Sequence, residues 1–218
     1  MNTADITKVV TILKRSVKKY DVPVIELAAR KSRTPYEALI SCILSLRTQD
    51  RTTGRASARL FKLARSPKAM VRLKSHIIQK AIYPVGFYRN KTKTILGISQ
   101  ALVKKYHSRV PDGLDELLKL KGVGRKTANI VLEHGFGKPS IAVDTHVHRI
   151  TNRWGYVTTK TPEKTEFALR AKLPKRYWRD FNFLLVAFGQ AICRPLSPRC
   201  SRCPVERFCE KAGVGKSR

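Results

Sequence analysis

The chain has 218 residues, of which 45 are Lys or Arg and only 15 are Asp or Glu, giving a formal net charge of +30. A hydrophobic content of 42% is typical of a globular protein and excludes an intrinsically disordered one. No apolar run reaches the roughly 18 residues that a membrane-spanning helix needs. So large an excess of cations attracts polyanions, so we expect nucleic acid as the partner, with an acidic membrane surface as the rival.

Residues 1–20 predict an amphipathic helix of the mature fold, with Asp5 placed to cap its start. The segment lacks the apolar core and the small-residue cleavage site of a secretory signal. We therefore expect a reducing compartment, in which the five cysteines form no disulfide framework. The apolar residues that share one face of this helix are Ile6, Val9, Val10, Leu13 and Val17.

Helical periodicity continues along the chain. Thr34-Pro35-Tyr36-Glu37 combines a capping box with a proline at the first helical position, and opens a helix that runs to Leu46. This helix contains Cys42, which we expect to be a small core residue. The apolar stretch 181–192 predicts a buried helix, whereas residues 141–143 fit a short strand or a loop. The whole pattern predicts an all-α protein, with further helix starts at Ser66-Pro67, Ser75, Asn90 and Thr161-Pro162.

Residues 117–128 predict two helices joined by a tight turn. Gly122 and Gly124 let the backbone reverse, and Val123 can fill the gap between the helices. Amide groups at the start of the second helix, next to Arg125, can hold a DNA phosphate. An ordinary helical hairpin is the alternative.

Lys126 falls in the first turn of that second helix. The positive end of the helix dipole, together with Arg125, disfavours the ammonium form, and a Schiff-base nucleophile requires a neutral amine. Asp144 is placed to cap a helix that runs to about Trp154, and in a chain with few acids a carboxylate here invites a chemical role. The alternatives are a solvated or phosphate-binding lysine and a cap without chemistry.

Four cysteines follow the spacing C-x6-C-x2-C-x5-C: Cys193, Cys200, Cys203 and Cys209. So compact a segment can wrap four thiolates around one metal centre. Zinc sites more often use two separated C-x-x-C pairs, whereas a single C-x-x-C flanked by lone cysteines favours a [4Fe-4S] cluster. Four thiolates leave no open ligand position, so we expect the cluster to be structural.

The hairpin, the Val143-Asp144-Thr145-His146 stretch and the four-cysteine loop stand in the order found in the endonuclease III family, which the chain resembles from about Val24 to Cys209. These are helix-hairpin-helix DNA glycosylases with a Gly/Pro-rich loop and a catalytic aspartate. The resemblance implies a two-lobed all-α fold, with a six-helix lobe at residues 28–138. Residues 1–27 and 139–218 would form the second lobe, which carries the C-terminal [4Fe-4S] loop. DNA would lie across the cleft between the lobes.

The resemblance also implies a base-excision-repair DNA glycosylase with AP lyase activity, acting on oxidised pyrimidines in double-stranded DNA. The damaged nucleotide is flipped out of the stack. Lys126 then attacks the sugar C1′ and displaces the base, which gives a Schiff base, while Asp144 stabilises the positive charge on the sugar. β-Elimination breaks the strand on the 3′ side. Relatives that only remove a base lack lysine at this hairpin position, so Lys126 favours the bifunctional class.

The chain departs from the family pattern at Arg47. Bacterial relatives place a glutamine there, where it fills the gap left by the flipped base, so either Arg47 or Gln49 takes this role. Phe87 matches a position that wedges an apolar side chain into the duplex, with a core aromatic as the alternative. The further DNA contacts implied by the resemblance are Gly122, Val123, Gly124, Arg125 and His146.

Two other functions stay open on the sequence. The same fold serves mismatch glycosylases, which remove thymine or uracil opposite guanine. A non-catalytic DNA-binding protein with a structural metal site is the alternative of another class, although pure binding would not require Lys126 and Asp144 together. We expect a monomer located in the cytoplasm, at the nucleoid.

Overall fold

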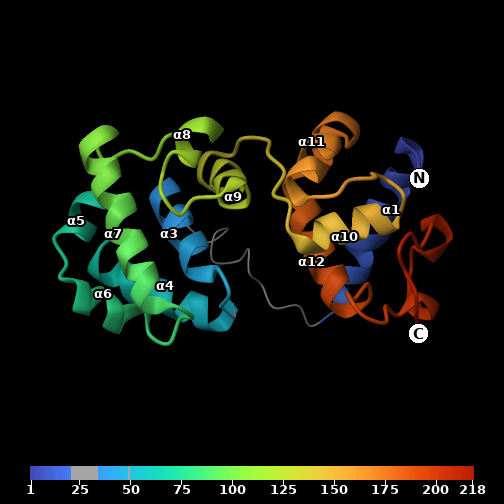
Figure 1. The fold of residues 1–218 in the computed structure, drawn as a ribbon, viewed down its shortest axis with the longest axis horizontal. Helices are drawn as coiled ribbons and strands as arrows, with labels where there is room; N and C mark the ends of the chain where they lie inside the picture. The colour runs from blue at the N-terminus through green and yellow to red at the C-terminus, as the bar shows by residue number, and fades with distance from the viewer. Residues whose placement is uncertain (21–33, 49) are drawn as a thin grey trace. The chain divides into compact units, whose positions relative to one another are not determined.

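The computed structural model describes residues 1–20, 34–48 and 50–218, and the regular structure in these ranges is entirely helical (Figure 1). The predicted all-α class is therefore confirmed. The chain divides into two compact units, one of Pro23–Ser140 and the other of Met1–Val22 with Ile141–Arg218. The α-helices are α1 (Thr3–Ser16), α3 (Pro35–Ser45), α4 (Asp50–Leu63), α5 (Pro67–Val71), α6 (Ser75–Ile82), α7 (Tyr88–Lys105), α8 (Leu114–Leu118), α9 (Arg125–Phe136), α10 (Thr145–Arg153), α11 (Pro162–Lys172) and α12 (Trp178–Ala191).

The Pro23–Ser140 unit is built around α3. This helix is buried along most of its length and packs against α4, α7 and α9 (Figure 1). Its start follows from the sequence: the Thr34 side chain accepts a hydrogen bond from the backbone N–H of Glu37, and Pro35 stands at the first helical position. A helix that is apolar on nearly every side belongs in a core, so α3 organises the others around it.

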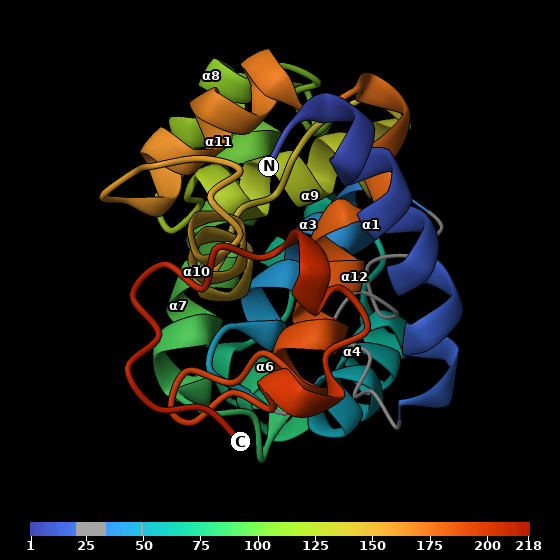
Figure 2. The ribbon, with the colours of Figure 1, turned by 90° about the vertical axis from the view of Figure 1, so that its right-hand side faces the viewer.

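The second unit combines the start of the chain with its C-terminal part. Here α12 packs against both α1 and α10, and the apolar core of the unit includes Trp154, Phe181 and Phe188 (Figures 1 and 2). The predicted buried helix at 181–192 is thus confirmed, as is the apolar face of the first helix. Its cap differs from the prediction: Asn2 caps α1, and Asp5 completes a capping box from the third helical position.

Three of the other predicted helix starts are correct and one is not. Ser66 and Thr161 cap α5 and α11, each with proline at the next position. The start predicted at Ser75 is also correct, since Ser75 is the first residue of α6 and Lys74 is its N-cap. Asn90 lies inside α7, which begins at Tyr88 because Phe87 takes a left-handed conformation there. Three 3-10 turns, η2 (Lys175–Tyr177), η3 (Cys200–Arg202) and η4 (Glu206–Phe208), follow α11 and α12, and η1 (Val17–Lys19) follows α1.

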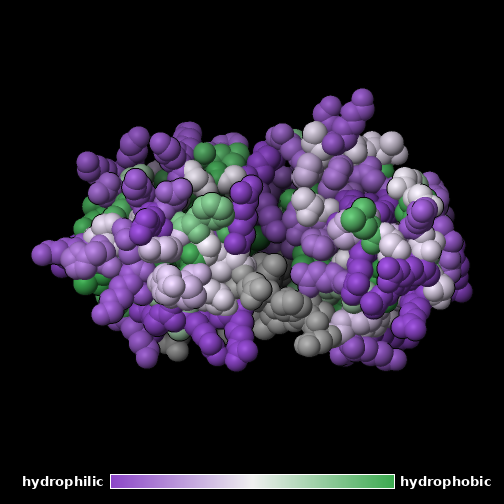
Figure 3. Space-filling view, turned by 60° about the horizontal axis from the view of Figure 1, so that its bottom comes forward, coloured by the Kyte–Doolittle hydropathy of each residue, from purple (hydrophilic) through white to green (hydrophobic). Residues whose placement is uncertain are grey.

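The molecular surface is rich in hydrophilic side chains, as the 28% of charged residues in the sequence leads one to expect. Hydrophilic side chains cover most of the face drawn in Figure 3, with isolated hydrophobic residues among them.

Residues 141–143 form no strand and lead as a loop into α10. Within the described part of the chain, no helix is long and apolar enough to cross a membrane.

Candidate active site

The turn between α8 and α9 depends on one glycine more than on the other. Gly122 has φ +93°, and a Cβ there would lie 2.7 Å from Cγ2 of Thr94, so only glycine fits without strain. Gly124 is an extended N-cap residue with open space around it. Between them Val123 is buried and joins the core of this unit, as predicted. The segment is therefore a helical hairpin with a tight glycine turn.

Lys126 is the second residue of α9 and lines a cavity of about 240 Å³. All of the lining residues belong to the Pro23–Ser140 unit. A volume of this order accommodates a small ligand such as a nucleobase. The other residues around the cavity are Cys42, Ser45, Leu46, Arg47, Thr48, Thr127 and Ile130.

Asp144 caps α10 in the other unit. One of its carboxylate oxygens, Oδ1, accepts hydrogen bonds from the backbone N–H groups of His146 and Val147, both at 2.9 Å. The predicted cap is therefore confirmed, and α10 ends at Arg153 with Trp154 as its C-cap. These two bonds fix the orientation of the carboxylate relative to the helix.

The four C-terminal cysteines line one small cavity at the end of α12. Burial raises the pKa of Cys203 to about 12, and it raises the pKa of Cys209 as well, with the neighbouring thiols adding to both shifts. Arg153 reaches this group of cysteines, because its guanidinium lies 3.5 Å from Sγ of Cys193 and donates to the carbonyl of Pro195 at 2.7 Å. Among the residues described, no three Cys, His, Asp or Glu side chains are grouped closely enough for a single metal ion.

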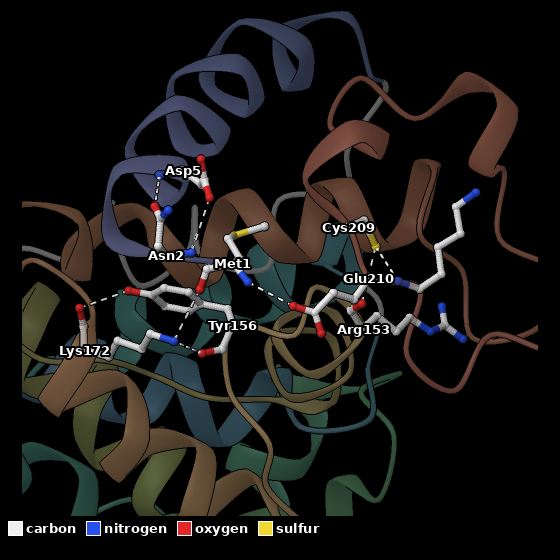
Figure 4. A network of polar contacts seen from close by, with 9 residues as sticks. Met1, Asn2, Asp5, Arg153, Tyr156, Lys172, Cys209 and Glu210 are labelled. Atoms are coloured by element: carbon white, nitrogen blue, oxygen red, sulfur yellow. Dashed lines mark hydrogen bonds and ion pairs between the residues drawn. The ribbon is translucent and has the colours of Figure 1, made fainter.

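The loop after Cys209 is attached to the rest of its unit by Glu210. Its carboxylate accepts a hydrogen bond from the amino group of Met1 at 2.9 Å (Figure 4). It also occupies the space beside Gly155, where an added Cβ would lie 1.9 Å from Oε2. The backbone N–H of Lys211 donates to Sγ of Cys209 at 3.3 Å. Sγ of Cys209 also donates to the carbonyl of Arg153 at 3.4 Å, so the last cysteine is tied to α10 and the residue after it to Met1.

Comparison with known proteins identifies the family. Residues 40–175 match the model of the HhH-GPD superfamily of base excision DNA repair proteins. The chain is 49% identical over 191 residues to endonuclease III of Thermotoga maritima, an alignment that covers 86% of this chain and 90% of that protein. This chain belongs to the endonuclease III family. It is accordingly a base-excision DNA repair enzyme, a DNA glycosylase with AP lyase activity.

Solved structures of the endonuclease III family share the fold. A non-covalent endonuclease III–DNA complex superimposes with a TM-score of 0.83 at 32% identity, covering 97% of this chain and 96% of that one. A trapped endonuclease III–DNA covalent intermediate gives a TM-score of 0.79 at 33% identity, over 94% of this chain and 95% of that one. The helix-hairpin-helix fold expected from the sequence is confirmed by these matches.

Arg47 and Phe87, which the family resemblance assigns to the DNA interface, lie next to each other. The guanidinium carbon of Arg47 is 6.0 Å from the centre of the Phe87 ring. Phe87 is 61% exposed, so the core-aromatic alternative is wrong. Both residues have positive φ, 52° and 57°, which is uncommon for any residue other than glycine. Gln49, the other candidate for filling the gap, lies outside the described residues.

His146 contacts α12 and the start of the cysteine loop through Arg149. Its Nδ1 lies 3.1 Å from a guanidinium nitrogen of Arg149, and that nitrogen also donates to the carbonyl of Cys193 at 2.8 Å. An added Cβ at Gly189 would lie 2.4 Å from the same Nδ1. His146 therefore packs from α10 against α12 within its own unit.

Cys42 was expected to be a core residue, and it is only 5% exposed. It also lines the cavity beside Lys126, and its carbonyl accepts a hydrogen bond from Ser45 at 2.8 Å. The spacing of residues along α3 contains no sign of this, because the same apolar pattern serves a residue in the core and one at the wall of a cavity. The place of Cys42 at the wall of this cavity could therefore not be predicted from the sequence.

Proposed function

We propose that Lys126 is the nucleophile of this glycosylase and lyase. The observation that carries the proposal is its place in the first turn of α9, at the wall of a cavity large enough for an extruded base. The covalent endonuclease III–DNA intermediate supports the proposal, since that relative forms a bond to DNA.

In the proposed reaction, Nζ of Lys126 forms a bond to C1′ of the sugar, while the C1′–N bond breaks and the base leaves with its electron pair. Loss of a proton from nitrogen and opening of the sugar give the Schiff base. Removal of a proton from C2′ then expels the 3′ phosphate and breaks the strand. Asp144 stabilises the positive charge that develops on the sugar and takes part in the proton transfers.

We propose oxidised pyrimidines in double-stranded DNA as the substrates. Two hydroxyl groups, those of Ser45 and Thr127, belong to residues that line the cavity. Oxidation adds hydroxyl and carbonyl groups to the edge of a pyrimidine, and a site that can hydrogen-bond such groups discriminates against a base that lacks them. The net charge of +30 supports binding to the DNA backbone, and the nucleoid is the location that this substrate implies.

We propose that Cys193, Cys200, Cys203 and Cys209 hold a [4Fe-4S] cluster. The residues fit the group, because all four thiols line one cavity with Arg153 beside them, and a multivalent metal centre would keep buried thiols deprotonated. When bound, the cluster supplies a rigid support for the loop.

Borohydride trapping on abasic-site duplex DNA tests the nucleophile. The native protein should form a covalent complex, and Lys126→Gln should form none. Lys121→Gln is the matched control, since it makes the same change of charge at an exposed residue of the same hairpin and should still trap. Trapping that persists in Lys126→Gln would assign the nucleophile to another amine.

A second set of measurements tests substrate and cluster. Single-turnover excision is compared for an oxidised pyrimidine opposite its normal partner and for thymine or uracil opposite guanine, and faster excision of the mismatch would reject our substrate class. Visible absorption and analysis of iron, sulfide and zinc decide the metal centre. Zinc in a colourless protein would reject the iron–sulfur assignment.

A further inference from the structure

Two loops of the Pro23–Ser140 unit meet where Arg47 and Phe87 lie side by side. One loop follows α3 and the other precedes α7. Their backbones are in direct contact: a Cβ on Gly86 would lie 2.8 Å from the carbonyl oxygen of Arg47. Both exposed side chains are therefore carried by a junction of two chain segments rather than by independent loops.

Lys91 lies directly beneath this junction. It belongs to α7, is only 7% exposed, and directs its ammonium group to the loop after α3. Its Nζ donates to the carbonyl of Leu44 at 2.7 Å, to Oγ1 of Thr48 at 3.0 Å and to the carbonyl of Leu46. The ammonium group has three protons, and these three uncharged oxygens accept one each. A cation at the end of α3 is also favoured by the dipole of that helix.

Thr48 joins the lysine to the second loop. Its Oγ1 accepts a hydrogen bond from Lys91 and another from the backbone N–H of Gly86 at 3.1 Å. The Lys91–Thr48–Gly86 chain of hydrogen bonds therefore connects α7, the loop that carries Arg47 and the loop that carries Phe87. Burial lowers the pKa of Lys91 to about 8, which is the physical cost of placing an ammonium group here. An apolar side chain would fill the same space without that cost.

We propose that Lys91 and Thr48 are positioning residues that fix Arg47 and Phe87 as one preformed unit for entry into the DNA duplex. The inference rests on the DNA-contacting roles expected of Arg47 and Phe87. Removing a base from the stack costs free energy that the inserted side chains must offset. Two residues already held in left-handed conformations lose less entropy on insertion than two mobile loops would.

Thr48→Val tests the inference, because it keeps the side-chain volume and removes the oxygen that joins the two loops. Single-turnover excision is measured on a lesion in a fully paired duplex and on the same lesion in a bulge, where extrusion of the base costs less. We expect Thr48→Val to slow excision from the paired duplex by about 10- to 100-fold, as for other small losses of positioning, with a much smaller loss on the bulge. Thr48→Ser, which restores the oxygen, should excise at close to the native rate.

Further variants separate this inference from the proposed roles of Arg47 and Phe87. Thr11→Val makes the same chemical change on α1 and should have no effect. Adding Thr48→Val to Arg47→Ala/Phe87→Ala should cause no further loss, because the residues being positioned are already absent. A fully additive loss, or an equal loss on both substrates, would overturn the inference alone. Native-rate excision by Arg47→Ala/Phe87→Ala would overturn the insertion roles and the inference together.

Lys91→Met provides an independent measure, and melting temperatures identify any variant that does not fold. If Thr48→Val fails to fold, Thr48→Ala replaces it in the same comparison. Lys91→Met should show the same selective loss on the paired duplex. A native rate for Lys91→Met on that substrate would remove the lysine from the proposal.

Discussion

Replacing Asp144 with asparagine should leave α10 intact while removing the carboxylate charge. Asparagine and aspartate are about equally good N-caps, and the amide oxygen can accept the same two backbone N–H bonds that Oδ1 of Asp144 accepts at 2.9 Å. Asp144→Ala removes both bonds and should cost about 1 kcal/mol of stability. In a chain of this length, that loss lowers the melting temperature by about 2–4 °C.

Asp144→Asn and Asp144→Ala should differ in stability but lose activity alike. If the charge of Asp144 stabilises the developing cation on the sugar, both variants should lose about 100-fold or more in the rate of base excision. Single-turnover excision of an oxidised pyrimidine and thermal unfolding are measured on the same preparations. Asp5→Asn is the control, since it changes another acid in the first turn of a helix of this unit. An Asp144→Asn enzyme within about threefold of the native rate would show that Asp144 is a cap and nothing more.

Three further outcomes are expected, each with its own measurement. Gly122→Ala should lower the free energy of unfolding by about 1–3 kcal/mol, because alanine is strained at φ +93° and its Cβ meets Thr94. Gly124→Ala should change the free energy of unfolding by no more than about 0.5 kcal/mol. Equal effects of the two variants in chemical denaturation would contradict this account of the turn. Gly86→Ala should reduce excision from a paired duplex, since the loops must separate to admit a Cβ 2.8 Å from a carbonyl oxygen; a native rate would mean that their contact is unimportant. The free energy of unfolding of the native protein, relative to that of Lys91→Met, should rise between pH 8 and 10.5. In that range the unfolded chain still binds the lysine proton, whereas the folded chain has lost it. A difference that does not change with pH would show that the pKa of Lys91 is not lowered.

Local rules made much of the fold predictable. Thr34 and Asp144 were expected to cap helices, and they do so through the side-chain bonds that such residues form in many proteins. The buried helix at 181–192 followed from its apolar length. The cap of α1 was assigned wrongly because Asn2 and Asp5 both suit a helix start, and only the folded backbone decides which residue is the cap.

Features that depend on contacts distant in sequence could not be predicted. Lys91 is one of 45 basic residues, and nothing around it in the sequence marks it as buried against the end of α3. Likewise, the approach of Gly86 to Arg47 joins residues that are far apart in the chain. A glycine or a lysine reveals such a role only when its neighbours in space are known. Cys42 is buried as predicted, but that it also lines the cavity depends on neighbours in space that the sequence does not reveal.

The division of the chain into units has a consequence for its biosynthesis. Pro23–Ser140 is a continuous stretch, so this unit can complete its core while the ribosome is still translating the remainder. The apolar face of α1 is made first but packs against α12, which is made near the end. A nascent chain stalled when the whole Pro23–Ser140 unit has left the ribosome, but before α12 is made, should therefore resist protease at the hairpin while its first helix is cleaved.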